Sequence, residues 1–188
     1  PRDASLLNPD AVKSLPPFVR PVAVFVDKDD EYISGVCDRY GIHIIQLHGA
    51  ESPEQCRRLK SKGFTVFKAI GIENSQDLEN LAIYDGVVDM FLFDTKCSCH
   101  GGTGKKFDWQ LLESYDLETP YLLSGGIDAG DINNIIKAMR PGRAGIDVNS
   151  RFETSPGVKD ISKLVNFILS LRKFNEHEPD TTPFWEKK

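Results

Sequence analysis

The sequence contains no long apolar run and no excess of positive charge. No stretch reaches the roughly 20 apolar residues that a membrane-spanning helix needs, and Pro1-Arg2-Asp3 lacks the apolar segment of a signal peptide. The formal net charge of −5 argues against attraction of the whole chain to nucleic acid or to an anionic membrane, although a local basic pocket could still bind a phosphate. We therefore expect a cytoplasmic protein.

Cysteine is scarce, with four residues in the chain. Cys37 and Cys56 fall on apolar helix faces, where reduced thiols in a core are expected rather than disulfides. Cys97-Ser98-Cys99-His100 looks like part of a metal cluster, but no second Cys or His pair stands at a ligand spacing elsewhere. We therefore expect no bound metal.

The remaining composition is that of an ordinary globular protein. The 188 residues are 40% hydrophobic and 27% charged, which is enough for one sizeable core. From Phe174 onward the chain is polar and carries proline. We expect one domain over residues 1–173 and a polar tail over residues 174–188.

Strand and helix patterns alternate along the chain. Six mainly apolar runs predict strands, at residues 21–26, 42–47, 64–70, 90–93, 120–124 and 143–148. The first is a continuous apolar run with β-branched valines, as expected for a strand that is buried on both faces of a parallel sheet. Helical patterns start near residues 8, 29, 52, 74, 108, 128 and 158. This order predicts an α/β protein with right-handed crossovers.

A doubly wound sheet and a closed (β/α)8 barrel both fit this order. The barrel is favoured because polar or ionisable residues stand at the ends of separate strands, where a barrel collects its site: Asp27, His48, Lys68, Asp94, Ser124 and Asp147. Ordinary roles are also open to them. Asp94 can cap a turn, and His48 can be a hydrogen-bonded structural histidine. Lys68 can extend its amine to solvent, and Asp147 can hold the neighbouring loop.

Two segments predict contacts with a phosphate. Ser124-Gly125-Gly126 and Asp147-Val148-Asn149-Ser150 follow the last two strands, where a barrel commonly builds a phosphate cup from backbone N–H groups and a hydroxyl. The glycine pair can instead be a simple turn between strand and helix. The glycines and lysines of residues 101–106 lack P-loop spacing, so we interpret them as a loop that closes over a substrate phosphate, or as a plain connection.

Several segments become specific when they are taken together. They are Gln46-Leu47-His48-Gly49, Phe93-Asp94-Thr95, residues 101–109, Leu123-Ser124-Gly125-Gly126, residues 145–150, Glu153, Pro156-Gly157 and Lys159-Asp160. In this order, and over the chain to about Arg172, they resemble the phosphoribosylanthranilate isomerase family, the (β/α)8 barrel enzymes of tryptophan biosynthesis.

The resemblance implies an Amadori rearrangement of N-(5'-phosphoribosyl)anthranilate to 1-(o-carboxyphenylamino)-1-deoxyribulose 5-phosphate, without metal or cofactor. In that chemistry an acid protonates the furanose ring oxygen, the ring opens to a Schiff base, and a base removes the C2' proton. Asp94 matches the general acid, which must be protonated in the reactive complex. Arg2 matches the arginine that holds the anthranilate carboxylate. The phosphate cup is matched by Ser124, Gly125, Gly126, Asp147, Asn149 and Ser150, and the matching motifs add His48 and Gly102 as candidates for substrate contacts.

The sequence departs from the family pattern in two places. The family begins with a strand that carries the general-base cysteine, followed by a helix and a second strand, and no cysteine here matches that position. We therefore expect the base and the first two barrel strands to lie outside this sequence, since a barrel missing two strands would expose sheet edges. Full turnover by the 188-residue chain alone would contradict that expectation. The second departure is Arg151, where the family has glycine; its guanidinium can reach the phosphate or face solvent.

Two alternatives remain open. Another ribulose-phosphate-binding barrel, such as an indole-glycerol-phosphate synthase, would share the phosphate cup but fits Phe93-Asp94-Thr95 poorly. A non-catalytic module that binds a phosphate ligand or another protein would explain the absence of the base. The resemblance also allows a homodimer, or a fused or adjacent tryptophan-pathway enzyme as partner.

Overall fold

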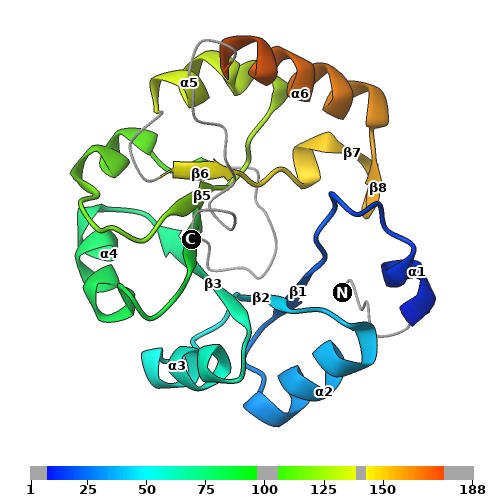
Figure 1. Ribbon diagram of the computed structural model, residues 1–188. Coiled ribbons are helices and arrows are strands. Elements are labelled where there is room, and N and C mark those ends of the chain that lie inside the picture. Colours follow the sequence, from blue (N-terminus) through cyan, green and yellow to red (C-terminus); the bar gives the residue numbers. More distant parts are fainter. Residues whose placement is uncertain (1–7, 97–105, 139–142, 176–188) are drawn as a thin grey trace. The chain divides into compact units, whose positions relative to one another are not determined.

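The structure is a computed structural model that describes residues 8–96, 106–138 and 143–175. Strands and helices alternate along the chain (Figure 1). The α-helices are α1 (Pro9–Lys13), α2 (Asp30–Tyr40), α3 (Pro53–Ser61), α4 (Ser75–Glu79), α5 (Ile132–Lys137) and α6 (Ile161–Asn175). The 3-10 helices are η2 (Asn80–Tyr84), η3 (Trp109–Ser114), η4 (Ala129–Asp131) and η5 (Ser150–Phe152). None of the helices in these ranges is long and apolar enough to cross a membrane.

Six strands form one sheet in the order of the sequence. They are β1 (Val22–Phe25), β2 (Ile44–Leu47), β3 (Thr65–Ile72), β4 (Met90–Thr95), β5 (Tyr121–Leu123) and β6 (Arg143–Ile146). β1, β2 and β3 pair in parallel, as do β5 and β6. β7 (Glu153–Ser155) and β8 (Val158–Lys159) form a separate antiparallel hairpin. All six predicted strands are thus confirmed.

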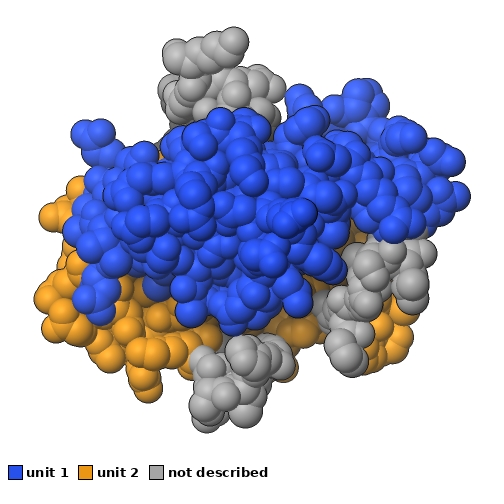
Figure 2. Space-filling view, turned by 90° about the horizontal axis from the view of Figure 1, so that it is seen from below, with its two compact units in different colours: residues 1–70, 80–92, 117–119 blue, residues 71–79, 93–116, 120–188 orange. Residues whose placement is uncertain are grey.

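The chain divides into two compact units (Figure 2). The first comprises residues 1–70, 80–92 and 117–119, and the second comprises residues 71–79, 93–116 and 120–188.

In the first unit, α2 and α3 form as their sequence signals predict. The Asp29 side chain accepts a hydrogen bond from the Tyr32 N–H at 2.7 Å, and Gly41 ends α2 in the left-handed conformation at φ 66°. Ser52 caps α3, whose first residue is Pro53. The buried residues of these helices and of β2 form the core: Ile33, Cys37, Tyr40, Ile45, Leu47, Cys56 and Leu59.

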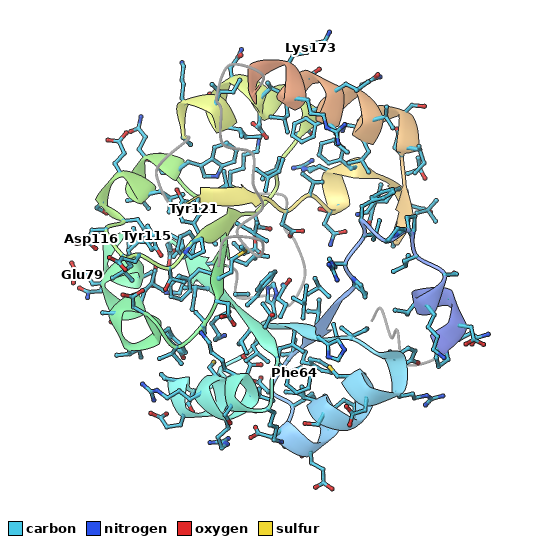
Figure 3. The ribbon with its side chains drawn as sticks, viewed as in Figure 1. Phe64, Glu79, Tyr115, Asp116, Tyr121 and Lys173 are labelled. Atoms are coloured by element: carbon cyan, nitrogen blue, oxygen red, sulfur yellow. The ribbon has the colours of Figure 1, made fainter. Side chains whose placement is uncertain are left out.

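In the second unit, aromatic rings fill the core around β4 and β5. The Phe93 ring centroid lies 4.9 Å from that of Tyr121 and 5.4 Å from that of Tyr115. The ring centroids of Tyr115 and Tyr121 are 5.1 Å apart; both residues are labelled in Figure 3. Such offset and edge-on pairs add about 0.5–1.5 kcal/mol each beyond their burial. Because Phe93 belongs to β4, this packing of three rings holds in place the strand that carries Asp94.

Some helices differ from the sequence prediction. The helix expected after β4 is the 3-10 helix η3, and the one expected at residues 74–81 divides into α4 and η2. α6 forms, but its apolar stripe is 39% to 65% exposed at Ile161, Val165, Ile168 and Leu169, as is Val158 before it. Phe167 is buried instead, because its ring packs on Phe152 with centroids 4.8 Å apart. This ring contact sets which face of α6 points inward.

Candidate active site

Three of the predicted site residues come together at the carboxyl ends of β4, β5 and β6 in the second unit. The Ser124 N–H donates to the Phe93 carbonyl at 2.8 Å, which places Ser124 beside Asp94. The Ser124 hydroxyl donates to Oδ2 of Asp147 at 2.8 Å. The ends of parallel strands are where α/β proteins place ligands. The grouping expected from the sequence is therefore present here for Asp94, Ser124 and Asp147.

Asp94 is the penultimate residue of β4 and is half-buried. Its Oδ1 accepts a hydrogen bond from the N–H of Thr95 at 2.7 Å, which fixes the orientation of the carboxyl group. Thr95 in turn accepts a hydrogen bond at Oγ1 from the Phe107 N–H at 3.1 Å. Sequence reasoning did not assign a role to Thr95, because its partner Phe107 lies 12 residues further along the chain.

Gly125 packs directly against this carboxyl group. A Cβ atom at Gly125 would lie 2.5 Å from Thr95 Oγ1, 2.8 Å from the Thr95 nitrogen and 3.1 Å from Asp94 Oδ1. Gly125 and Gly126 also have φ values of 86° and 65°, a region that residues with a side chain rarely adopt. The glycine pair is therefore more than a simple turn, because only glycine allows the backbone after β5 to approach Asp94 so closely.

Replacing Gly125 by Ala should lower the free energy of unfolding by about 1–3 kcal/mol, because the new methyl group meets backbone at a positive φ. Gly130→Ala is the matched control in the same unit, since a Cβ there meets no atom within 4 Å. Its effect should stay within about 1 kcal/mol in either direction. Urea unfolding of the two variants measures the difference. Equal effects would show that the contact with Thr95 is not constraining.

The loop after β6 supplies the other predicted cup residues. Asn149 precedes η5, and Asn149, Ser150 and Arg151 are all exposed. Phe152 anchors the end of η5 in the core, where it is fully buried. The loop thus offers an exposed polar surface on a fixed base.

Two lysines flank residues 97–105, and each forms an ion pair. Lys96 Nζ lies 2.9 Å from Asp77 Oδ1, and Lys106 Nζ lies 2.6 Å from Asp131 Oδ1. Burial alone would raise the pKa of Asp77, but hydrogen bonds from Lys96 and from two backbone N–H groups lower it below its usual range. The predicted closing loop, with Gly102 and the Cys97-Ser98-Cys99-His100 segment, lies outside the described residues, as does Arg2.

In the first unit, Lys68 is not the solvent-directed lysine that the sequence allowed. Lys68 is 2% exposed, and its Nζ donates to Glu51 Oε2 at 3.1 Å and to the Gly49 carbonyl at 2.8 Å. Glu51 is 3% exposed and also accepts hydrogen bonds from the N–H groups of Asp27 and Gly49. Burial of both charges is tolerated because each has a partner. This network ties the ends of β1 and β2 to the middle of β3, where Lys68 lies, and sequence reasoning missed Glu51.

His48, Cys37 and Cys56 are the other candidate residues of the first unit. His48 is exposed, and its Nδ1 lies 2.8 Å from Nε2 of Gln46. Cys37 and Cys56 are buried, as expected, and burial raises the pKa of both thiols to about 11. A thiol with such a pKa is almost entirely protonated at neutral pH, so neither cysteine suits the role of general base.

Comparison with known proteins identifies the family. The model of N-(5'-phosphoribosyl)anthranilate isomerase matches residues 7–170 of this chain. The chain belongs to the N-(5'-phosphoribosyl)anthranilate isomerase family. The isomerase of Phocaeicola vulgatus is 44% identical over 159 residues, which cover 85% of this chain and 78% of the relative. The isomerase of Parabacteroides distasonis is 47% identical over 150 residues, which cover 80% of this chain and 68% of the relative.

Solved structures agree. The phosphoribosylanthranilate isomerase of Thermotoga maritima matches with a TM-score of 0.75 and 34% identity, over 88% of this chain and 78% of that chain. A second isomerase, solved with reduced 1-(o-carboxyphenylamino)-1-deoxyribulose 5-phosphate, matches with a TM-score of 0.74 and 32% identity, over 89% and 80%. The predicted α/β fold of the (β/α)8 barrel class is thereby confirmed. So is the predicted activity, the isomerisation of N-(5'-phosphoribosyl)anthranilate in tryptophan biosynthesis.

Proposed function

We propose that the strand ends of the second unit hold the phosphoribosyl part of the substrate, with Asp94 as general acid and with residues 124–126 and 147–150 as the phosphate cup. The observation that carries this assignment is the packing of Gly125 on Asp94 and Thr95. In a 5'-phosphoribosyl group the furanose ring oxygen is separated from the phosphate ester oxygen by C4' and C5' only. An acid that protonates that ring oxygen must therefore lie next to the phosphate-binding loop.

In this assignment Asp94 donates its proton to the ring oxygen as the C1'–O bond breaks, and the nitrogen lone pair forms the Schiff base. A base then removes the C2' proton, which gives the enol that becomes the ketone of the product. The raised pKa of Cys37 and Cys56 supports a base outside the described residues. Arg2 and Gly102 keep the roles that the resemblance implies, and His48 is proposed as a contact to the substrate.

The cup is proposed to bind phosphate through backbone N–H groups, because successive N–H groups in glycine-rich turns form concave anion sites. Gly125 and Gly126 provide two of them at positive φ. The Ser124 hydroxyl is engaged with Asp147 and orients the loop between β5 and the next helix. Arg151, exposed beside the cup, adds a positive charge to this edge.

Titration with inorganic phosphate tests the cup directly and needs no turnover. In a 15N-labelled sample, the amide signals of Gly125, Gly126 and Ser150 are expected to shift together with one dissociation constant. The reduced product analogue should shift the same signals and compete with phosphate, since both place a phosphate in the cup. Shifts confined to other regions, or absence of competition, would contradict the proposed site.

We infer one barrel domain over residues 1–173, a cytoplasmic location and a homodimer. The homodimer is supported by a relative, the dimeric phosphoribosylanthranilate isomerase of Thermotoga maritima, from which monomers have been generated. Sedimentation of the purified protein measures the assembly state, and a monomer at micromolar concentration would contradict the homodimer.

A further inference from the structure

Lys159, in β8, holds the loop that follows β6. Its Nζ donates to Asn149 Oδ1 at 2.6 Å, to the Asn149 carbonyl at 3.0 Å and to Glu153 Oε1 at 3.0 Å. A lysine ammonium has three N–H donors, and three acceptors are present here. The side chain of Glu153 is 7% exposed and that of Lys159 is 32% exposed, so this ion pair is less screened by solvent than a surface pair. The contact therefore fixes Asn149 relative to Glu153.

Lys163, in the first turn of α6, links the loops after β5 and β6. Its Nζ donates to the Arg151 carbonyl at 2.7 Å and lies 3.5 Å from Asp128 Oδ2. The ammonium group also stands 5.2 Å from the ring centroid of Phe152, within the range of a cation–π contact. Asp128 belongs to the loop after β5, and Arg151 belongs to the loop after β6. One side chain thus bridges the two loops that form the proposed cup.

The pKa of Asp128 reflects its contact with Lys163. Burial alone would raise the pKa of Asp128, but the hydrogen bond from the Gly130 N–H and the charge of Lys163 outweigh burial and lower the pKa below its usual range. Asp128 is therefore an anion at neutral pH and a continuous partner for Lys163.

We propose that Lys159 and Lys163 are positioning residues for phosphate binding: Lys159 fixes the loop after β6, and Lys163 holds that loop at the separation from the loop after β5 that the substrate phosphate requires. Neither lysine is assigned a direct contact with the reacting atoms. The proposal rests on the phosphate cup described above, because it concerns how that cup is held. It predicts that loss of either lysine weakens phosphate binding and leaves the chemical step unchanged.

Lys159→Met, Lys163→Met and Lys173→Met provide the test in the full protein. A hydrogen bond to a charged group contributes enough that removing Lys159 should weaken inorganic phosphate binding about 10-fold. The KM for the phosphoribosyl substrate should rise by a similar factor, with kcat within about two-fold of the parent, since uniform binding is lost. Lys159→Arg should recover part of the phosphate affinity. Lys173, exposed near the end of α6 (Figure 3), is the control of equal charge and should change neither constant.

The outcomes separate the two proposals. A purely structural role for Lys159 and Lys163 would lower the melting temperature and the active fraction while KM and the phosphate dissociation constant stayed at parent values, and this would overturn the positioning role alone. Phosphate binding by the parent protein away from Gly125 and Gly126 would overturn the cup and the positioning role together. A 10-fold weakening for the Lys173 variant as well would also overturn the proposal, because a general charge effect would then explain the data.

Discussion

Replacing Lys68 by Met is expected to lower the free energy of unfolding by about 3–5 kcal/mol, because it removes one partner of a buried ion pair. Both side chains are almost fully buried, with Lys68 at 2% and Glu51 at 3% exposure. Without the ammonium group, the Glu51 carboxylate would remain in the core and keep the backbone N–H donors of Asp27 and Gly49 but lose its cation. Desolvation of that charge is what destabilises the variant.

Chemical denaturation of Lys68→Met and of Lys13→Met measures the contrast. Lys13 pairs with Asp10 at 3.3 Å, and their side chains are 68% and 78% exposed. Its loss should therefore cost at most about 1 kcal/mol. The double variant Lys68→Met with Glu51→Gln should regain part of the lost stability, because no unpaired charge is then buried. A single variant at Lys68 that loses less than about 1 kcal/mol would show that the pair contributes little.

The Lys68 network also shows where sequence reasoning reached its limit. Lys68 was predicted at a strand end but lies in the middle of β3, opposite Leu47 at the end of β2. Its partner Glu51 immediately precedes Ser52, the N-cap of α3. A carboxylate before a helix start is usually solvated, and nothing in the local pattern marks this one as buried. Only the tertiary contact between β3 and the loop after β2 draws it inward. The periodicity of apolar residues along the chain carries no information about such a long-range pair of charges.

The strands were predictable for the opposite reason. Continuous apolar runs such as Met90–Phe93 are buried along their whole length, so the local pattern and the tertiary environment agree. The same consistency holds at the predicted helix starts near residues 29 and 52, where the side chains of Asp29 and Ser52 cap α2 and α3. Strand ends followed from these runs, and the candidate site followed from the strand ends.

Lys159 and Lys163 were missed as functional residues because their partners, two backbone carbonyls, a loop amide and the carboxylates of Glu153 and Asp128, come from other segments. A lysine pair at an i, i+4 spacing ordinarily indicates a solvated face. The apolar stripe of α6 is a related case. Its periodicity would place the stripe in the core, but the contact between Phe152 and Phe167 sets a different inward face of the helix. In both cases a loop whose course the sequence does not specify decides which residues are used.

Replacing Asp94 by Asn is expected to lower kcat about 10²–10⁴-fold, the usual contribution of general acid catalysis. An amide has nearly the same shape, and its oxygen can accept the 2.7 Å hydrogen bond that Thr95 N–H donates to Asp94 Oδ1. The strand end and the position of Gly125 should therefore be preserved. What is lost is the proton that the ring oxygen must receive.

The measurement pairs isomerase kinetics with binding of the reduced product analogue. Affinity of Asp94→Asn for this analogue should remain within a few-fold of the parent, because ring opening has already occurred in the analogue and no proton is needed. Asp116→Asn is the control of equal charge change; Asp116 is exposed in the same unit (Figure 3) and should leave kcat at the parent value. Loss of analogue affinity in step with kcat would indicate a damaged site rather than a missing acid.

An unchanged kcat for Asp94→Asn would redirect attention to Asp147, the other carboxyl group at these strand ends. Asp147 is the weaker candidate, because its Oδ2 is engaged with the Ser124 hydroxyl at 2.8 Å. This contact suits Asp147 to orienting the cup. Asp147→Asn should therefore raise KM more than it lowers kcat, whereas Asp94→Asn should do the reverse, and the two variants together assign the acid.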